Sequence, residues 1–186
     1  MKTIAKKFGS YIKLTFDKPL VGVNPGQCVT LDGKWFAVYD SDHIGFSVLV
    51  KDDSYFVDND PKEIVGPVGK GFTSCLHKRA IVVAGGTGIG AIVPVIRARN
   101  KYGLSTDVLF YSRGNISSIR ADQATIGMCR NVIFWNTLEK GRPANPLTPL
   151  YDRPLDAFVY VAGPKSLVEA TQKASADINY ICYVNT

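Results

Sequence analysis

The chain has 186 residues, of which 46% are hydrophobic and 20% are charged, and its formal net charge is +6. This length allows one large domain or two small ones, and the apolar content is ordinary for a globular core. The basic residues are spread out and no apolar run approaches the roughly 18 residues of a membrane span, so nucleic-acid and membrane partners are not expected, whereas anionic nucleotides are.

The cysteines and the N-terminus bear on the compartment. The four cysteines form no C-x-x-C pair, so we expect buried free thiols rather than a metal site or an iron–sulfur cluster. The first eight residues mix charged and polar side chains with no apolar block behind them. We therefore expect a cytoplasmic protein.

The first half of the chain alternates strand patterns with turn residues. Residues 8–16 alternate polar and apolar side chains, and Pro19 follows them. Further strands are expected at 27–31, 35–39, 45–51 and 63–65. Helical periodicity nowhere lasts more than a turn here. Short strands at this spacing predict a small antiparallel β-barrel.

The run 80–90, AIVVAGGTGIG, begins the second half and predicts a strand, a tight turn and a helix. Gly86, Gly88 and Ala91 fit the G-x-G-x-x-[G/A] spacing. There, missing side chains let backbone N–H groups and a helix N-terminus approach a pyrophosphate. The alternative is that these glycines serve only a tight turn.

The elements that follow have βαβ order. The helix should begin at about Gly90, with Pro94 tolerated near its first turns or kinking it, and Gly103 can cap it. Strands are expected at 107–111, 132–135, 157–162 and 180–184, with helices at 117–126 and 165–176. The proline-rich stretch 139–154 is either a mobile flap or a connector. The fold class is therefore a β-barrel, residues 1–75, followed by a Rossmann-like parallel α/β domain, residues 76–186.

The order of the motifs resembles the ferredoxin-reductase-like flavoprotein superfamily. The motifs are a barrel, Gly66 to Phe72 (GPVGKGF), the strand–GGTGIG–helix unit, YSR at 111–113, and VAGP at 161–164. The 66–72 motif is most similar to the electron-transfer subunit of dihydroorotate dehydrogenase. The resemblance implies electron transfer in the cytoplasm between a nicotinamide dinucleotide and a partner, a catalytic dehydrogenase subunit of pyrimidine biosynthesis, through FAD.

The resemblance also implies cofactor-binding positions. The turn from Gly85 to Gly90 would hold the pyrophosphate of NAD or NADP, and Gly163 with Pro164 would line the nicotinamide or flavin edge. Ser112 and Arg113 would lie near the adenosine ribose, where Arg113 favours NADP slightly. The turn comprises Gly85, Gly86, Thr87, Gly88, Ile89 and Gly90.

The flavin motif departs from the family pattern. The family has Arg-x-Tyr-Ser/Thr on a barrel strand, where this chain has Lys34, Trp35, Phe36 and Ala37. Lysine lacks the guanidinium fork, alanine lacks the hydroxyl, and Phe36 retains a ring for stacking. The family's phosphate-binding helix is replaced by the acidic stretch 52–62, and the clustered cysteines of a [2Fe–2S] site are missing.

Three functions therefore stay open: an electron-transfer component that carries flavin, a non-catalytic partner subunit that keeps the reductase fold, and a free-standing NAD(P)H:flavin reductase. None requires a side-chain acid or base, since the cofactors supply the chemistry. The isolated histidines His43 and His77 are accordingly interpreted as structural or surface residues.

Overall fold

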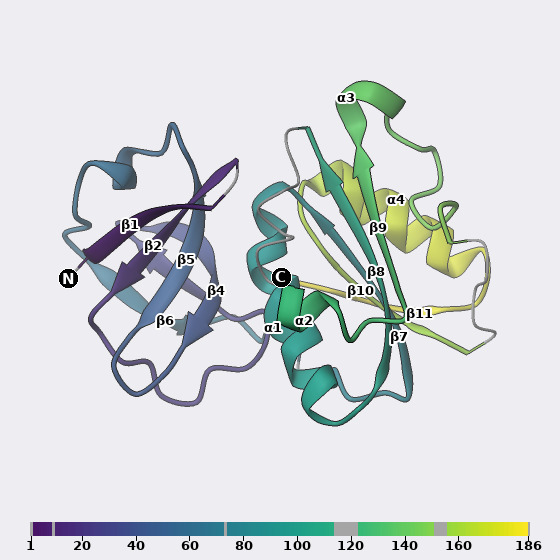
Figure 1. The fold of residues 1–186 in the computed structure, drawn as a ribbon, viewed down its shortest axis with the longest axis horizontal. Helices are drawn as coiled ribbons and strands as arrows, with labels where there is room; N and C mark the ends of the chain where they lie inside the picture. Colours follow the sequence, from purple (N-terminus) through teal and green to yellow (C-terminus); the bar gives the residue numbers. More distant parts are fainter. Residues whose placement is uncertain (1, 9, 73, 114–122, 151–155, 186) are drawn as a thin grey trace.

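The computed structural model describes residues 2–8, 10–72, 74–113, 123–150 and 156–185, which form two lobes (Figure 1). The first lobe is a curled antiparallel sheet of six strands in the order β1-β2-β5-β4-β3-β6. The strands are β1 (Lys2–Phe8), β2 (Tyr11–Phe16), β3 (Cys28–Leu31), β4 (Lys34–Ser41), β5 (Phe46–Lys51) and β6 (Ile64–Val68). The predicted fold class, a barrel followed by a Rossmann-like lobe, is confirmed.

The first lobe differs from the prediction at its start. Residues 8–16 were expected to form one strand, but β1 ends at Phe8 and pairs antiparallel with β2, with Phe8 opposite Tyr11. The sequence signal of β1 is weak because Lys6 and Lys7 flank few apolar residues. A short 3-10 helix, η1 (Tyr55–Val57), also lies in the stretch without helical periodicity, and it buries Phe56.

Alternate residues of the strands fill the interior of the first lobe. Leu14, Val38 and Val48 are buried there, and the rings of Phe16 and Phe46 stack with centroids 5.0 Å apart. The period-2 pattern seen in the sequence thus marks the face that packs inward.

The second lobe is a parallel sheet of five strands in the order β11-β10-β7-β8-β9. Helices α1 and α2 lie between this sheet and the first lobe, and α4 covers the opposite face (Figure 1). The central strands β7 and β10 are almost fully buried, as expected for strands covered on both faces. The elements are β7 (Arg79–Gly85), η2 (Gly86–Gly88), α1 (Ile89–Lys101), β8 (Ser105–Ser112), α2 (Gln123–Ile126), β9 (Asn131–Asn136), α3 (Thr137–Lys140), β10 (Phe158–Ala162), α4 (Lys165–Ala176) and β11 (Ile181–Val184).

The helix boundaries refine the sequence prediction. Helix α1 begins at Ile89, after the 3-10 turn η2, and Pro94 lies inside it, where proline cannot donate to the carbonyl of Gly90. Gly103 has a φ of 64° and follows the last turn, so the expected glycine cap is confirmed. Of the helix expected at 117–126, the described part is α2, and residues 114–122 lie outside the described residues.

The stretch 139–154 is partly ordered against the sheet. It begins in α3, whose N-cap residue Asn136 accepts a hydrogen bond from the Leu138 N–H, and Leu147 and Leu150 are buried farther on. The indole N–H of Trp135 donates to the carbonyl of Gly141 over 2.8 Å. Part of the stretch up to Leu150 is therefore packed on the protein, while 151–155 lie outside the described residues.

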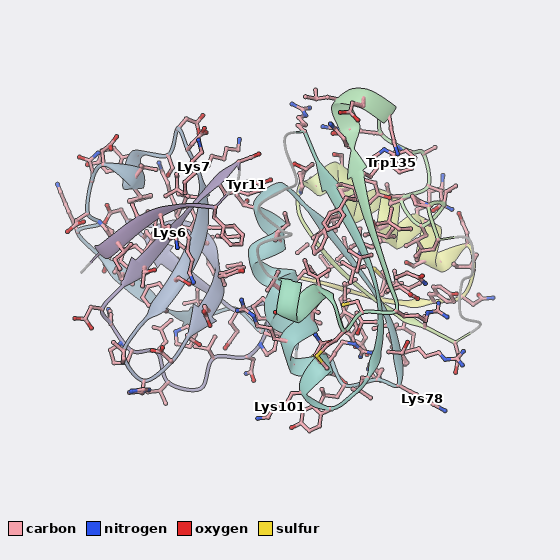
Figure 2. All side chains as sticks on the ribbon, viewed as in Figure 1. Lys6, Lys7, Tyr11, Lys78, Lys101 and Trp135 are labelled. Atoms are coloured by element: carbon pink, nitrogen blue, oxygen red, sulfur yellow. The ribbon has the colours of Figure 1, made fainter. Side chains whose placement is uncertain are left out.

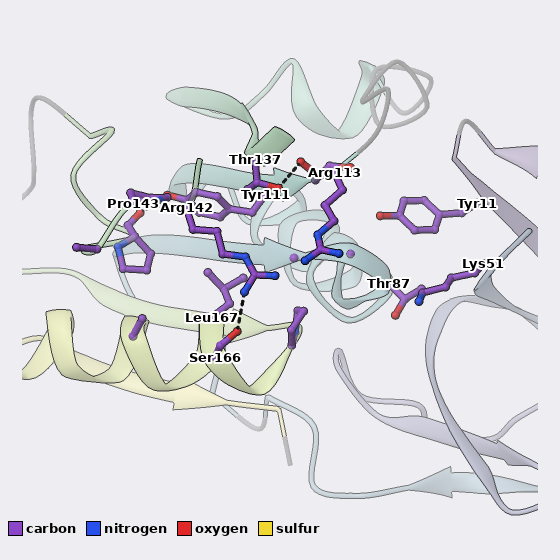
Figure 3. Close-up of a pocket in the computed structure, with 17 residues that line it drawn as sticks. Tyr11, Lys51, Thr87, Tyr111, Arg113, Thr137, Arg142, Pro143, Ser166 and Leu167 are labelled. Carbon is purple, nitrogen blue, oxygen red and sulfur yellow. Dashed lines mark hydrogen bonds between the residues drawn. The ribbon is translucent and has the colours of Figure 1, made fainter. Parts of the chain in front are cut away.

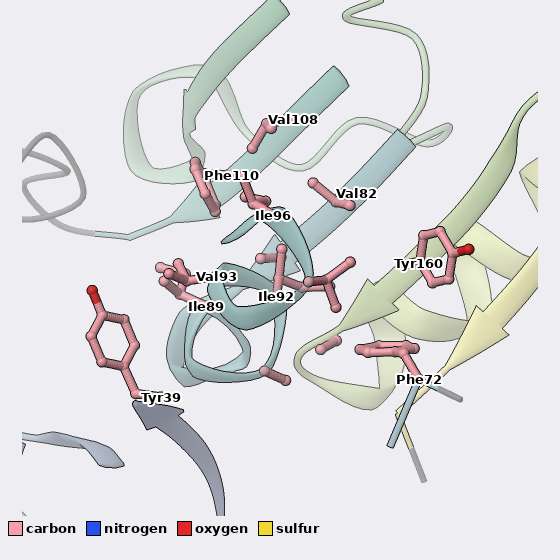
Figure 4. Close-up of a cluster of buried hydrophobic side chains, with 14 of the residues drawn as sticks. Tyr39, Phe72, Val82, Ile89, Ile92, Val93, Ile96, Val108, Phe110 and Tyr160 are labelled. Carbon is pink, nitrogen blue, oxygen red and sulfur yellow. The ribbon is translucent and has the colours of Figure 1, made fainter. Parts of the chain in front are cut away.

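A shared hydrophobic cluster joins the two lobes (Figure 4). Tyr39 and Leu49 of the first lobe pack with Ile89, Ile92 and Ile96 of α1. Across the same contact, the guanidinium of Arg97 donates to the Tyr39 carbonyl over 3.0 Å and lies 4.7 Å from the Tyr39 ring centroid. We propose a domain boundary between residues 75 and 76, because β6 ends at Val68 and β7 begins at Arg79.

Arg99 is fully buried at the other end of α1. Its guanidinium donates to the carbonyls of Cys75 and His77 at 2.7 Å each, to the Ser105 carbonyl at 2.6 Å, and to the Thr106 hydroxyl at 2.8 Å. Burial lowers the pKa of this guanidinium. The side chain thus ties the segment between the lobes to the start of β8.

The basic side chains are dispersed over the surface (Figure 2). Lys6 lies on the first lobe, whereas Lys78 and Lys101 lie at the lower end of the second lobe in this view. Among the helices of the described residues, none combines the length and hydropathy that crossing a bilayer would require.

Candidate functional site

The candidate site is a cavity of about 670 Å³ at the carboxyl edge of the parallel sheet (Figure 3). The ends of β7 and β8, the start of α4 and the segment after α3 surround it, and two residues of the first lobe complete its wall. In open α/β sheets this edge is where ligands bind. The lining consists of Tyr11, Lys51, Gly85, Gly86, Thr87, Tyr111, Ser112, Arg113, Thr137, Arg142, Pro143, Ala144, Pro146, Pro164, Ser166, Leu167 and Ala170.

Some residues of the predicted glycine turn face the cavity, whereas others pack against neighbouring parts of the protein. Gly85, Gly86 and Thr87 line the cavity, and a Cβ on Gly86, whose φ is 56°, would meet nothing within 4 Å. Gly88, in contrast, packs on the next strand, since a Cβ there would lie 2.3 Å from the Ala162 carbonyl oxygen. Ile89 is buried in the shared cluster. Only the first part of the turn is therefore placed to meet a ligand.

The last residue of the predicted turn, Gly90, lies against the first lobe rather than in the cavity. A Cβ on Gly90 would lie 3.6 Å from the Ala37 carbonyl oxygen, which is ordinary van der Waals contact. The first turn of α1 thus rests on β4.

In the second predicted motif, Gly163-Pro164, one residue faces the cavity and the other packs against a strand. Pro164 lines the cavity, but Gly163, with a φ of 150°, packs against β7, since a Cβ would lie 2.9 Å from the Gly85 carbonyl oxygen. The close approach of these two strand ends requires glycine at this position.

Among the described residues, three cationic side chains line the cavity, and none of the lining residues carries a carboxylate. Arg113, which the sequence predicted, follows β8, and Ser112 precedes it. Lys51 at the end of β5 and Arg142 after α3 were not predicted, and Arg142 lies 3.5 Å from the Ser166 hydroxyl (Figure 3). Because the charges add without opposition, the cavity attracts an anion.

Tyr11 reaches the cavity from β2 in the first lobe. It is hydrogen-bonded to the side chain of Ser112, and its pKa is raised by burial, an effect that this hydrogen bond opposes. Neither Tyr11 nor Lys51 belongs to a sequence motif. They lie opposite each other on β2 and β5, at the end of the first-lobe sheet that meets the cavity.

An apolar wall faces the cations. Pro143, Ala144 and Pro146 form one side of it, and Leu167 and Ala170 of α4 form the other. The Tyr111 hydroxyl donates to the Pro146 carbonyl and fixes this segment, and burial raises the pKa of that hydroxyl. A site with an apolar slot and cations beside it suits a planar base with phosphates.

The predicted flavin strand lies outside the cavity, because none of Lys34, Trp35, Phe36 and Ala37 lines it. Phe36 packs on the interior of the first lobe, with its ring edge-on to Phe56 at 5.6 Å between centroids, and Trp35 is 61% exposed. The prediction placed Phe36 in a flavin stack, but this ring is engaged inside its own lobe.

The remaining titratable side chains form no catalytic or metal centre in the described residues. His43 is exposed, and His77 stacks on Phe158 with centroids 3.5 Å apart. Across the described ranges, no group of three or more His, Cys, Asp or Glu side chains is arranged to hold a metal ion.

The four free thiols should react slowly in the native protein. Burial raises the pKa of all four, and that of Cys129 to about 11, where Asp107 adds to the effect. At pH 8 only about one Cys129 in 1,000 is then the reactive thiolate. We expect slow reaction with a thiol reagent in native buffer and rapid reaction of all four thiols in guanidinium chloride; one rapidly reacting native thiol would contradict the burial.

Comparisons with known proteins identify the fold. No protein-family model matches the sequence, and no curated protein sequence matches it significantly. Among solved structures, the NADH-dependent reduced ferredoxin-NADP oxidoreductase, studied for flavin-based electron bifurcation, is similar with a TM-score of 0.76 and 16% identity over 98% of this chain and 74% of that one. The flavohaemoglobin-like FAD/NAD-binding domain of nitric oxide dioxygenase from Vibrio cholerae is similar with a TM-score of 0.72 and 15% identity over 98% and 96%.

A third similar structure is full-length CYP116B46 from Tepidiphilus thermophilus, with a TM-score of 0.76 and 13% identity over 98% of this chain. The chain spans only 28% of the length of that protein. These likenesses show that the chain has the ferredoxin-reductase-like fold, with its barrel and Rossmann-like lobes. The closer resemblance to the dihydroorotate dehydrogenase subunit stays a prediction.

Proposed function

We propose that this chain is the nicotinamide-dinucleotide-binding component of a flavin-dependent electron-transfer oxidoreductase. The observation that carries the proposal is the cavity at the carboxyl edge of the sheet, where the described lining places Gly86 and Thr87 with Lys51, Arg113 and Arg142 and includes no carboxylate. A dinucleotide has two phosphates for the cations and a base for the apolar wall. When bound, its nicotinamide ring would give or accept a hydride.

The residues present fit such a ligand. The open space above Gly86 leaves the backbone of the turn accessible to a diphosphate, and the slot between Pro143 and Leu167 is bounded by apolar side chains. Arg113 can form a two-pronged contact with a phosphate, which includes a ribose 2′-phosphate. We therefore favour NADP over NAD.

Calorimetric titration with NADP⁺ and NAD⁺ tests the proposal. Arg113→Gln should weaken NADP⁺ binding by roughly 10- to 100-fold, since a charge-assisted hydrogen bond contributes about 1.5–3 kcal/mol. The loss should be smaller for NAD⁺, which lacks the 2′-phosphate. Lys78→Gln, which removes an exposed cation far from the cavity, is the matched control and should leave binding unchanged.

Absence of binding heat with either nucleotide would refute the proposal. Equal losses in Arg113→Gln and Lys78→Gln would show a general charge effect rather than a site. Equal losses for NADP⁺ and NAD⁺ in Arg113→Gln would remove the preference for NADP.

A finer assignment follows from the motif at residues 66–72, which resembles that of the dihydroorotate dehydrogenase electron-transfer subunit. On this assignment the partner is a catalytic dehydrogenase subunit. A non-catalytic partner subunit of the same shape is the second candidate, favoured by the inward packing of Phe36. Turnover of NADPH on adding a flavin or a flavoprotein distinguishes the two, because only the first requires it.

A further inference from the structure

We infer that this chain has no flavin of its own, and that the isoalloxazine ring that exchanges a hydride with its dinucleotide comes from a separate molecule. The inference rests on the proposed function for the identity of the dinucleotide. It is carried by strand β4, where Lys34, Phe36 and Ala37 are occupied by contacts within the chain, and by the acidic segment 52–62.

The first step concerns the ring that would stack on a flavin. Phe36 points to the interior of the first lobe, opposite Val29 on β3, and Phe56 meets it edge-on. Phe56 is 2% exposed, and the ammonium of Lys34 lies 5.7 Å from its ring centroid. The aromatic residue and the cation of the motif are thus both directed at the chain's own Phe56.

The second step concerns the space beside Ala37. The first turn of α1 lies close to this residue: a Cβ built on Gly90 would lie 3.8 Å from the Ala37 Cβ. The Gly90 Cα, one bond of about 1.5 Å behind it, is therefore within about 5.3 Å of that atom. A planar ring between the two would need about 7 Å, which is two van der Waals contacts. Arg97 holds α1 in place through the carbonyl of Tyr39 and the carboxylate of Asp40, 3.5 Å away. Opening the space would break the contact between the lobes.

The third step concerns the phosphates. The stretch 52–62 carries aspartates at 52, 53, 58 and 60, and its one described helix is the three-residue η1. At its end, the N–H groups of Lys62 and Glu63 both donate to the Asp32 carboxylate, over 2.9 and 2.8 Å. These two backbone donors are therefore already bonded to a carboxylate, whose charge repels phosphate.

The reaction balances with an external flavin. The reduced dinucleotide loses a hydride from C4 of its nicotinamide ring, and oxidised flavin takes up that hydride together with one proton from solvent. The products are the oxidised dinucleotide and the two-electron-reduced flavin. The flavin is either a diffusing substrate or the prosthetic group of a partner protein.

The experiment measures flavin content and flavin binding of the purified full chain. We expect a colourless protein that releases no flavin on denaturation and retains no added FAD through gel filtration, while the same sample gives binding heat with NADP⁺. A flavin that co-purifies in a one-to-one ratio, or added FAD that stays bound one-to-one through gel filtration, would overturn the inference. Failure of NADP⁺ to bind would overturn the proposed function instead, and the flavin result would still stand.

A double variant tests whether flavin fails to bind because functional groups of the family pattern are missing or because the space beside β4 is filled. Lys34→Arg with Ala37→Ser restores the guanidinium and the hydroxyl of the family pattern, but leaves Phe56 and α1 in place. We expect this variant to remain free of flavin. If it bound FAD, the packing at β4 would not be the barrier, and the inference would fail.

Two further assays distinguish the sources of the flavin. Saturable oxidation of NADPH on adding FMN would support the inference with free flavin as substrate. Oxidation that occurs only after adding a flavoprotein retained on the immobilised chain would support it with a partner's flavin. NADPH oxidation with a one-electron dye acceptor and neither flavin present would show a redox group within the chain and would overturn it.

Discussion

Replacing Gly88 with valine should destabilise the protein by about 3 kcal/mol or more, because the new side chain has no space. A Cβ at this position would lie 2.3 Å from the carbonyl oxygen of Ala162 and 2.7 Å from the backbone nitrogen of Gly163. These are backbone atoms at the end of β10, a central strand, and cannot move aside as a side-chain tip could. Chemical denaturation followed by circular dichroism measures the loss.

Gly86→Ala is the matched control within the same turn. A Cβ on Gly86 would have open space around it, so the only cost is that of its φ of 56°, roughly 1 kcal/mol. We expect this variant to fold and to affect dinucleotide binding more than stability. If Gly88→Val instead kept its stability and lost only binding, Gly88 would be a ligand position and the packing interpretation would be wrong.

Replacing Arg99 with methionine should cost about 3–5 kcal/mol, the largest loss we expect from a residue outside the site. Its guanidinium satisfies three carbonyls and one hydroxyl, and methionine would leave those carbonyls without their donor in a buried place. Two of the acceptors, in Cys75 and His77, belong to the segment between the lobes. The midpoint of guanidinium-induced unfolding should fall accordingly.

Two other variants define what Arg99 contributes. Lys101→Met, on an exposed position of the same helix, should change stability by no more than about 0.5 kcal/mol. Arg99→Lys should recover only part of the loss, since an ammonium cannot reach the acceptors as the guanidinium fork does. A stability of Arg99→Met within about 1 kcal/mol of the native protein would show that water replaces the guanidinium at those carbonyls.

The candidate site shows how far motifs predict a binding cavity. Gly86, Thr87 and Arg113 were predicted because each lies next to a strand end, and all parallel strands end at one edge of the sheet. Arg142 and Lys51 were missed because they belong to a connector and to the other lobe, far away in the sequence. The four flavin positions, Lys34 to Ala37, lie outside this cavity and stay a prediction, since the orientation of their side chains depends on which face of β4 is turned inward.

By itself the sequence determined the order of the elements and the two-lobed architecture, because alternation along strands and the strand–glycine–helix unit are local properties of the chain. It also placed the glycine turn at a strand end. Only the tertiary structure decided that Gly88 packs while Gly86 faces the cavity, that Tyr11 and Lys51 reach the second lobe, and that Phe56 covers Phe36. The reason is that these are contacts between segments distant in sequence, which are fixed by how the lobes pack and leave no periodic signal in the chain.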